Sequence, residues 1–385
     1  MSEFKGSIAQ VNVQFPIETV IEPIAGENYT RAMIFMHAGL ASANLPGIAE
    51  PVAGMKVELD SSSYGNVAGG ALKKWLVPFF TSAQAAKLAV ILYDTDTTED
   101  DGNGGTVNVP ATSPLSAVYE AYKFWAYFKF GFAASADYNG LQAELAALCL
   151  TDPLYSTLWV GTSDIAVLTR SSALVTALNN AGADARVVYN PDENINAALA
   201  QLGDTLAVVN STGTPVGNDI DMHAFNTIGA SGAKDSNGNW TNLSATQKAV
   251  LDEQRIGYNT YVGDGTENVV TEGSMTLKGT IIGAEWVKRY IEYKCKVRGA
   301  NFVTQRNRFR NNDEYQATLL LISDEATPFV NMGRLSNFMI TASTFAELPV
   351  SADAIIAPNA WRANYIDRLR TVTIYGTLYV TQPSK

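Results

Sequence analysis

Residues 239–303 read NWTNLSATQKAVLDEQRIGYNTYVGDGTENVVTEGSMTLKGTIIGAEWVKRYIEYKCKVRGANFV, and this stretch decides the fold that we expect. Ser244 followed three residues later by Gln247 has the spacing of a capping box, which predicts a helix from there to about residue 257. Two extended segments around a glycine turn follow. From residue 283 apolar residues recur every three or four positions, which indicates a second helix. The stretch therefore specifies a scaffold and no reaction centre.

The composition limits what kind of protein this is. Of 385 residues, 46% are hydrophobic and 17% are charged, whereas about a quarter is the usual charged share. We therefore expect other chains to cover much of the surface. The net charge of -11 argues against a nucleic-acid-binding surface. Lysine and arginine are scattered, apart from Arg306, Arg308 and Arg310.

Short strands and helices alternate after residue 140, which is typical of parallel crossovers and predicts an α/β core. Helices are expected at 140–150, 171–180 and 194–202, and strands at 157–160, 185–189 and 205–209. In the first third, a helix is expected at 71–80 and a strand at 88–93. The predicted organisation is an amino-terminal arm strand (1–22), a loop-rich region that could form an outward-facing subdomain (23–112), the core with a mixed sheet flanked by helices (113–368), and a carboxyl-terminal arm strand (369–385).

The aromatic run at 115–132 reads best as one large core helix. Glu120, Lys123 and Lys129 interrupt it, and it is shorter than the roughly 20 apolar residues that span a membrane. The alternatives are a helix whose aromatic face contacts another subunit and a helix that lies at a membrane surface.

The sequence shows no arrangement typical of an active site. His37 and His223 lack metal-spaced partners, and neither the dinucleotide nor the phosphate-loop glycine pattern occurs. Residues 161–164 follow a predicted strand, where a helix cap is favoured over an anion site. Cys149 and Cys295 are expected to be buried thiols, although a disulfide between them stays open.

Charged clusters also have simple interpretations. The acidic run at 94–101 does not fit the spacing of an EF-hand, so a solvated loop is favoured over a calcium site. Glu285, Arg289 and Glu292 have the spacing of a salt-bridged helix face. The first five residues lack a basic start and an apolar run, so we expect no signal peptide and synthesis in the cytosol.

Taken together, the segments at 239–244, 257–261, 263–265 and 279–286, with Gly273, resemble the core of contractile bacteriophage tail sheath proteins. The likeness is greatest to a compact sheath-like phage family, in which Gly-x-Asn-x-Tyr precedes a glycine turn and a long helix with Trp near its start. Residues 333–369 and the alternating end of the chain are similar to that family's end. The likeness covers residues 206 to 385. Residues 281–283 depart from it, because such proteins often have an acidic residue there.

This resemblance implies a structural virion protein without catalytic activity or cofactor. It implies stacked hexameric rings around a tail tube, contraction that drives the tube into a host cell for genome ejection, and contacts with the tail tube, baseplate and tail terminator proteins. It implies no binding of nucleic acid and no membrane insertion. Terminal arms would add strands to a neighbour's sheet, through Ile8, Val11, Val13, Phe15, Val372, Ile374, Leu378 and Val380. The candidates for tube contact are Arg289, Arg306, Arg308 and Arg310.

Three alternatives remain. The two terminal strands could pair within one subunit. The chain could be another tail or baseplate structural protein. A soluble α/β hydrolase is the third, and the scarcity of histidine, cysteine and motif glycines counts against it.

Overall fold

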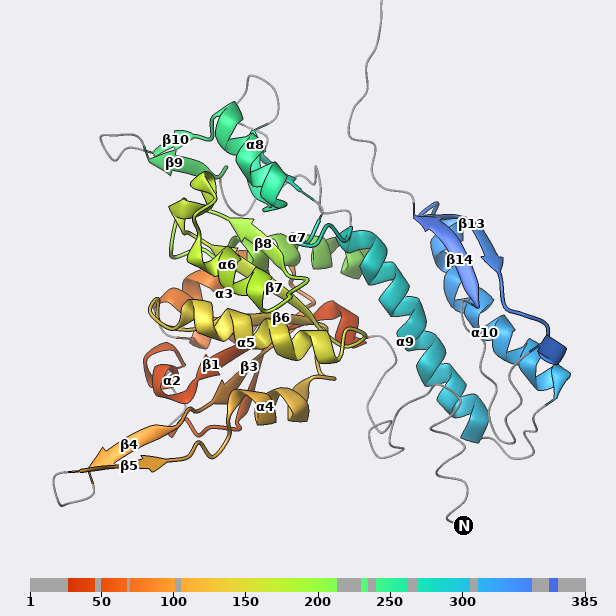
Figure 1. Ribbon diagram of the computed structural model, residues 1–385, viewed down its shortest axis with the longest axis horizontal. Helices are drawn as coiled ribbons and strands as arrows, with labels where there is room; N and C mark the ends of the chain where they lie inside the picture. The colour runs from red at the N-terminus through yellow and green to blue at the C-terminus, as the bar shows by residue number, and fades with distance from the viewer. Residues whose placement is uncertain are drawn as a thin grey trace, which may run out of the picture.

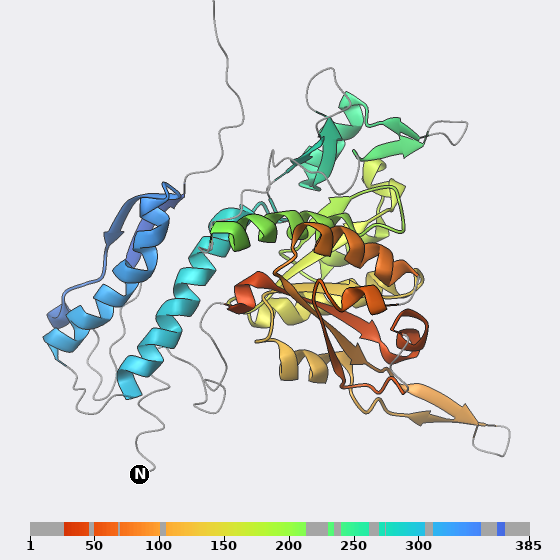
Figure 2. The same ribbon diagram turned by 180° about the vertical axis from the view of Figure 1, so that it is seen from behind.

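The structure is a computed structural model that describes residues 27–45, 50–67, 70–100, 105–212, 230–234, 240–261, 269–273, 275–304, 311–347 and 360–365. Figure 1 shows a sheet with helices on both faces and, beside it, a layer of two long helices with a two-stranded sheet. Figure 2 shows the same layer from behind, on the other side of the view. The fold is α/β with a mixed sheet, which confirms the predicted class.

The central sheet has the strand order β2-β3-β1-β6-β7-β8. Strand β1 pairs in parallel with β3 on one side and with β6 on the other. The parallel pairing continues through β7 and β8, whereas β2 is an antiparallel edge strand. The strands are β1 (Arg31–His37), β2 (Lys56–Leu59), β3 (Lys87–Tyr93), β6 (Phe128–Phe132), β7 (Thr157–Thr162) and β8 (Arg186–Tyr189).

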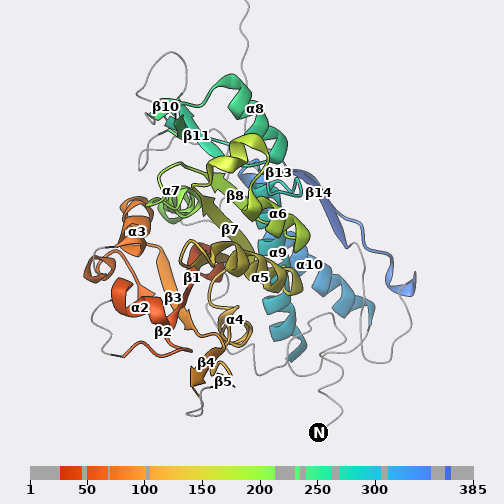
Figure 3. The same ribbon diagram turned by 60° about the vertical axis from the view of Figure 1, so that its left-hand side comes forward.

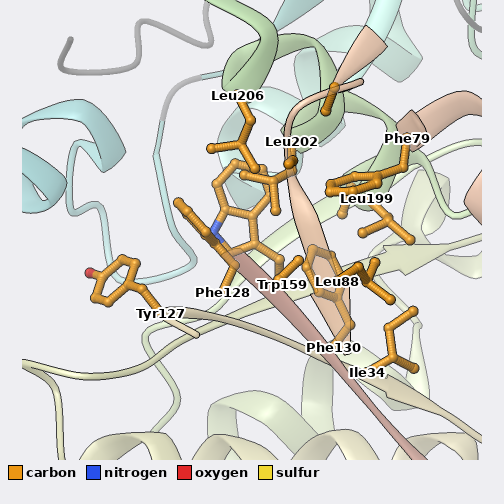
Figure 4. Packing of buried hydrophobic residues seen from close by; sticks show 14 of the residues in the cluster. Ile34, Phe79, Leu88, Tyr127, Phe128, Phe130, Trp159, Leu199, Leu202 and Leu206 are labelled. Atoms are coloured by element: carbon orange, nitrogen blue, oxygen red, sulfur yellow. The ribbon is translucent and has the colours of Figure 1, made fainter. Parts of the chain in front are cut away.

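The sheet is buried on both faces. On one face Ile34, Phe130 and Trp159 pack against α3 and α7 through Phe79 and Leu202 (Figure 4). The intervening residues of the same strands pack on the other face against α4, α5 and α6. Figure 3 shows these helices around the strands. The helices are α2 (Ala38–Asn44), α3 (Ala71–Ser82), α4 (Leu115–Tyr122), α5 (Tyr138–Thr151), α6 (Ala173–Asn180) and α7 (Ala197–Thr212), with the short turns η2 (Glu27–Thr30) and η3 (Tyr64–Asn66).

The aromatic run at 115–132 is not one helix, so that prediction is wrong. Helix α4 ends at Tyr122, and the second half of the run is β6, between β1 and β7. The fully buried Lys129 ties the two together, because its Nζ donates to the carbonyl of Lys123 at 2.8 Å and to that of Ala126. A strand buried on both faces has a continuous apolar run, which periodicity alone does not distinguish from a buried helix.

The strand predicted at 205–209 is also wrong, because α7 continues through these residues. Thr205 Oγ1 donates to the carbonyl of Gln201, one turn earlier, at 2.7 Å. Leu202 and Leu206 face the sheet one turn apart (Figure 4). Packing of this helix on the sheet outweighs the preference of its branched residues for strands.

The region at 23–112 supplies β1, β2 and β3, so the sheet takes strands from both sides of the predicted boundary at residue 113. The predicted helix and strand are confirmed as α3 and β3. Sequence reasoning missed β1, whose five central residues are all buried, and the edge strand β2. The loop-rich description therefore fits only the connections of this region.

The stretch at 239–303 forms the elements that its sequence predicts. Ser244 Oγ accepts from the backbone N of Gln247, and the Gln247 side chain accepts from the backbone N of Ser244, which confirms the capping box. The helix ends at Gln254, slightly earlier than predicted, with Arg255 in the left-handed region. The predicted elements are α8 (Ala245–Gln254), β11 (Tyr258–Tyr261), β12 (Val269–Glu272) and α9 (Ile282–Thr304). A short strand that was not predicted, β10 (Trp240–Asn242), pairs with β9 (Gly232–Lys234), which lies before the stretch.

Two further features differ from expectation. The acidic run at 94–101 is not only loop: β4 (Thr97–Asp100) pairs with β5 (Thr106–Val109) as an antiparallel hairpin. Helix α10 (Asn312–Asn331) was not predicted, although Asn311 caps it by accepting from the backbone N of Glu314. After α10 come β13 (Leu335–Ile340), η5 (Phe345–Glu347) and β14 (Trp361–Tyr365).

The burial of Lys129 makes stability depend on pH. Burial lowers the pKa of Lys129 to about 7, although Cys149 and Asp152 act to raise it. Because lysine in an unfolded chain titrates near ~10.4, the unfolded state binds more protons between these values, and stability should rise with pH in that window. We expect this group to add about 1 kcal/mol of unfolding free energy per pH unit from pH 7.5 to 9.5.

Urea unfolding of the native chain and of Lys129→Met across that range measures the effect. The slope of stability against pH should be smaller in the variant, and equal slopes in the two proteins would contradict the prediction.

Candidate assembly interface

At the edge where an open parallel sheet usually binds a ligand, a histidine side chain caps one of the protein's own helices. This edge is the carboxyl end of the strands, between β1 and β6, where the strand order reverses. His37 ends β1, and its Nδ1 accepts from the backbone N of Gly39 at 3.1 Å, so it caps α2. Among the described residues, no group of three or more His, Cys, Asp or Glu could hold a metal ion. His223 lies outside these residues.

The segment at 161–164 acts as a helix cap, as predicted. The Asp164 carboxylate accepts from the backbone N of Ala166 at 2.9 Å and from Ser172 Oγ at 2.7 Å, at the start of η4 (Ile165–Thr169). Its negative charge opposes an anion at this place. Cys149 and Cys295 are both free thiols. In the described part of the chain, no helix has the length and apolar character needed to cross a membrane.

Tyr29 joins the central sheet to the carboxyl-terminal layer, which consists of α9, α10, β13 and β14. Its side chain is 0% exposed, and its hydroxyl bonds to the carbonyl of Leu154 at 2.5 Å and to that of Arg289, on α9, at 2.9 Å. Its ring stacks on Tyr127 at 4.5 Å and meets Trp286 edge-on at 5.9 Å. Burial raises the pKa of Tyr29 well above its ordinary value, so its hydroxyl keeps its proton. Tyr29, which lies two residues before the start of β1, thus contacts α9 through both its hydroxyl and its ring.

The predicted salt-bridged face on α9 is confirmed. Arg289 Nε donates to Glu285 at 2.6 Å and Nη1 donates to Glu292 at 3.2 Å. Burial opposes the charged form of Arg289, but the two carboxylates outweigh it and raise its pKa. The charge of Arg289, one of the four candidates for tube contact, is therefore balanced within its own helix. Arg306, Arg308 and Arg310 lie outside the described residues, and so do all eight candidate arm residues.

The Gly-x-Asn-x-Tyr segment at 257–261 has a structural role that sequence reasoning did not identify. Arg186 is 0% exposed and lies against Gly257, where an added Cβ would be 2.1 Å from Arg186 Nη2. The guanidinium donates to the carbonyl of Met275 at 3.1 Å and to Gln201 at 3.4 Å. Gln201 in turn donates to Asn259 at 3.0 Å. A buried polar network therefore ties β11 to β8 and α7, which requires glycine at residue 257 and a side-chain amide at residue 259.

The carboxyl-terminal layer is built around contacts between α9 and α10. Phe329 on α10 packs edge-on against Trp286 and Tyr290 of α9. Arg298 of α9 pairs with Glu325 at 2.7 Å and with Asp324 at 3.1 Å. Strand β13 packs on α10 and pairs antiparallel with β14. The layer therefore presents a two-stranded sheet on the outside of two packed helices.

An apolar part of α10 is only partly covered. The run Leu319, Leu320, Leu321 and Ile322 has no fully buried member, and Leu320 is 63% exposed. Only Tyr315, Ala326 and Phe329 of this helix are buried. Because a helix that is apolar on all sides is normally buried, this run is a candidate contact surface for another chain.

Replacing Tyr29 should separate the effects of its ring and its hydroxyl. We expect Tyr29→Phe to cost about 1–2 kcal/mol, because the carbonyls of Leu154 and Arg289 lose the one hydroxyl proton that they share. Tyr29→Ala should cost about 3–5 kcal/mol, because the ring contacts are also lost. Urea unfolding measures both, and amide hydrogen exchange along α9 should increase more in Tyr29→Ala. Equal stability of the two variants would contradict the role of the ring.

Gly257→Ala should destabilise the protein by about 1–3 kcal/mol, because the new methyl group displaces a buried guanidinium that is held by hydrogen bonds. Gly140→Ala is the matched control, because nothing lies within 4 Å of a Cβ there, on α5. The control should stabilise by up to about 1 kcal/mol. Thermal or urea unfolding compares them, and a neutral Gly257→Ala would argue against the network.

Comparisons with known proteins agree with this architecture. No protein-family model and no curated protein matches the chain. Among solved structures, the chain is similar to the helical sheath of the anti-feeding prophage (AFP) in its contracted state, with 12% identity and a TM-score of 0.59 over 93% of this chain and 97% of that one. It is also similar to a chain in the AFP baseplate structure, with 10% identity and a TM-score of 0.60 over 93% and 95%.

The resemblance to contractile tail sheath proteins is thus confirmed at the level of the fold. It extends well beyond the segments that carried it in the sequence, because the amino-terminal half of the chain is included in the similarity. The chain has the fold of contractile sheath proteins.

Proposed function

We propose that this protein is the structural subunit of a contractile tail sheath, polymerising as stacked hexameric rings around a tail tube. Contraction of the sheath drives the tube through a host envelope. The observation that supports this most is the similarity to the AFP sheath, which extends over nearly the full length of both chains. The subunit acts in the virion and meets the tail tube, baseplate and tail terminator proteins as partners.

The subunits join by strand exchange in this proposal. The two-stranded sheet β13–β14 is the acceptor, because within the described part of the chain each of its strands has one paired edge only, and such a sheet gains stability from further strands. The arm strands at 7–20 and 371–382 of neighbouring subunits are the donors, and main-chain hydrogen bonds join the chains. The carboxyl-terminal arm begins only a few residues after β14 in the sequence, which supports the choice of this sheet as the acceptor.

The work of contraction comes from the assembly and needs no catalytic residue or cofactor. The subunits move as rigid bodies between two packings, while the strand joints persist. A rigid unit suits this motion, and Tyr29 supplies rigidity by holding α9 to the sheet. The partly exposed apolar run of α10 provides a further surface that neighbouring subunits cover.

The tube contact is assigned to the residues that follow α9. Arg306, Arg308 and Arg310 provide a positive charge that complements an acidic tube surface. Arg289 is less suited to this role than the other three, because Glu285 and Glu292 hold its guanidinium.

Negative-stain microscopy of the purified protein tests the proposal. We expect striated hollow cylinders, because the open sheet edges and the apolar face of α10 favour polymerisation. Monodisperse monomers at high protein concentration would contradict it. As a control, the chain without residues 371–385 should keep the helix content and stability of its core but form no cylinders. Unchanged cylinders after this deletion would argue against strand exchange.

A further inference from the structure

The β4–β5 hairpin is a projecting element that the proposed strand exchange does not use. Figures 1 and 2 both show it extending away from the body of the molecule. All residues of β4 are exposed, and Val107 on β5 is 54% exposed. An isolated two-stranded hairpin is only marginally stable in water, so this element has to be stabilised at its base or by a partner.

The base of the hairpin is well fixed. Asp94 accepts from the backbone N and Oγ1 of Thr112, at 3.0 and 2.7 Å, and from the backbone N of Ser113 at 2.7 Å. Asp96 accepts from the backbone N of Ala111 at 2.9 Å. The two aspartates therefore hold the two strands together at the base of the hairpin, so β4 and β5 project in a defined direction.

The segment that forms the hairpin is rich in acidic residues. The chain has no lysine or arginine between Lys87 and Lys123, whereas Asp94, Asp96, Glu99, Asp100 and Asp101 fall within this interval. Glu99 lies on β4, whose residues are all exposed. Such an edge resists pairing with an arbitrary strand and favours a positively charged partner.

The amino-terminal end of α3 has the complementary charge. No aspartate or glutamate occurs between Asp60 and Asp94, and Lys73 and Lys74 lie in the first turns of α3. Lys73 donates to the carbonyl of Gly65 and Lys74 to the side-chain carbonyl of Asn194, so both charges face neutral oxygens. No side chain caps this helix end, and the helix dipole adds to its positive potential.

Each surface also presents one exposed valine. Val77, one turn after Lys73 and Lys74 on α3, is 41% exposed, and Val107 lies on the hairpin beside the acidic strand. The other side of α3, including Trp75 and Phe79, is buried against the sheet. An apolar contact next to opposite charges is the usual composition of an interface between proteins.

The two surfaces lie at the same end of the molecule but apart, with α2 between them in Figures 1 and 3. We propose that the acidic β4–β5 hairpin docks on the basic amino-terminal end of α3 in a second copy of this chain. This contact rests on the self-association in the proposed function and adds to the strand exchange a second joint between subunits, one that depends on charge.

A charge-exchange experiment tests the contact. One variant carries Glu99→Lys and Asp100→Lys, and the other carries Lys73→Glu and Lys74→Glu. In either variant alone, β4 and the amino-terminal end of α3 carry charges of the same sign, so sedimentation at low salt should show self-association weakened about tenfold or more. A mixture of the two variants restores opposite signs across the contact and should recover association. Added salt should weaken association of the native chain.

The matched control carries Asp252→Lys and Asp313→Lys, at exposed residues of α8 and α10. It changes the net charge by the same amount as the hairpin variant but at sites away from the proposed contact. It should leave association unchanged. If the two variants and their mixture all associate to the same extent, the proposed contact is overturned. It is also overturned if the native chain stays monomeric. If the native chain associates and the exchange pattern is found, but microscopy shows no striated cylinders, the contact stands and the proposed function fails.

Discussion

The contact of Tyr29 with α9 is the interaction on which the arrangement of this protein depends. Tyr29, just before the first strand of the sheet, meets a helix that begins more than 250 residues later, through one hydroxyl contact to the carbonyl of Arg289 and a cluster of aromatic rings. Helix α9 then carries α10, and α10 carries the β13–β14 sheet. Tyr155 adds a second contact with α9, because its ring meets that of Tyr293 edge-on at 6.1 Å. These contacts join the carboxyl-terminal layer to the central sheet.

A second constraint is the buried charge of Arg186. An uncompensated guanidinium is costly to bury, and here main-chain and amide oxygens from separate segments surround it. The glycine at residue 257 is needed because the guanidinium occupies the space where its side chain would be. The Gly-x-Asn-x-Tyr motif, which suggested the family from the sequence, therefore has a role in packing. This role explains why the segment is strongly patterned although it resembles no catalytic site.

Assembly and catalysis make different demands on a fold of this type. A parallel sheet with helices on both faces often binds a ligand at the carboxyl ends of its strands, yet here His37 and Asp164 already cap the local helical turns. Among the described residues, an acidic hairpin, a basic helix end, a two-stranded sheet and an apolar run on α10 are exposed to solvent. All four are suited to contacts between chains.

The sequence by itself determined the local elements of this protein. The capping box at Ser244, the α9 periodicity and the α/β alternation depend on residues within a few positions of one another, so their spacing predicts them. Only the tertiary structure decided that residues 128–132 form a central strand, that α7 continues past residue 205, and that β1 pairs with both β3 and β6. Burial on both faces erases the periodic signal that distinguishes a strand from a helix. Contacts such as that of Tyr29 with Arg289 join residues that no local pattern relates, so they exist only once the chain has folded.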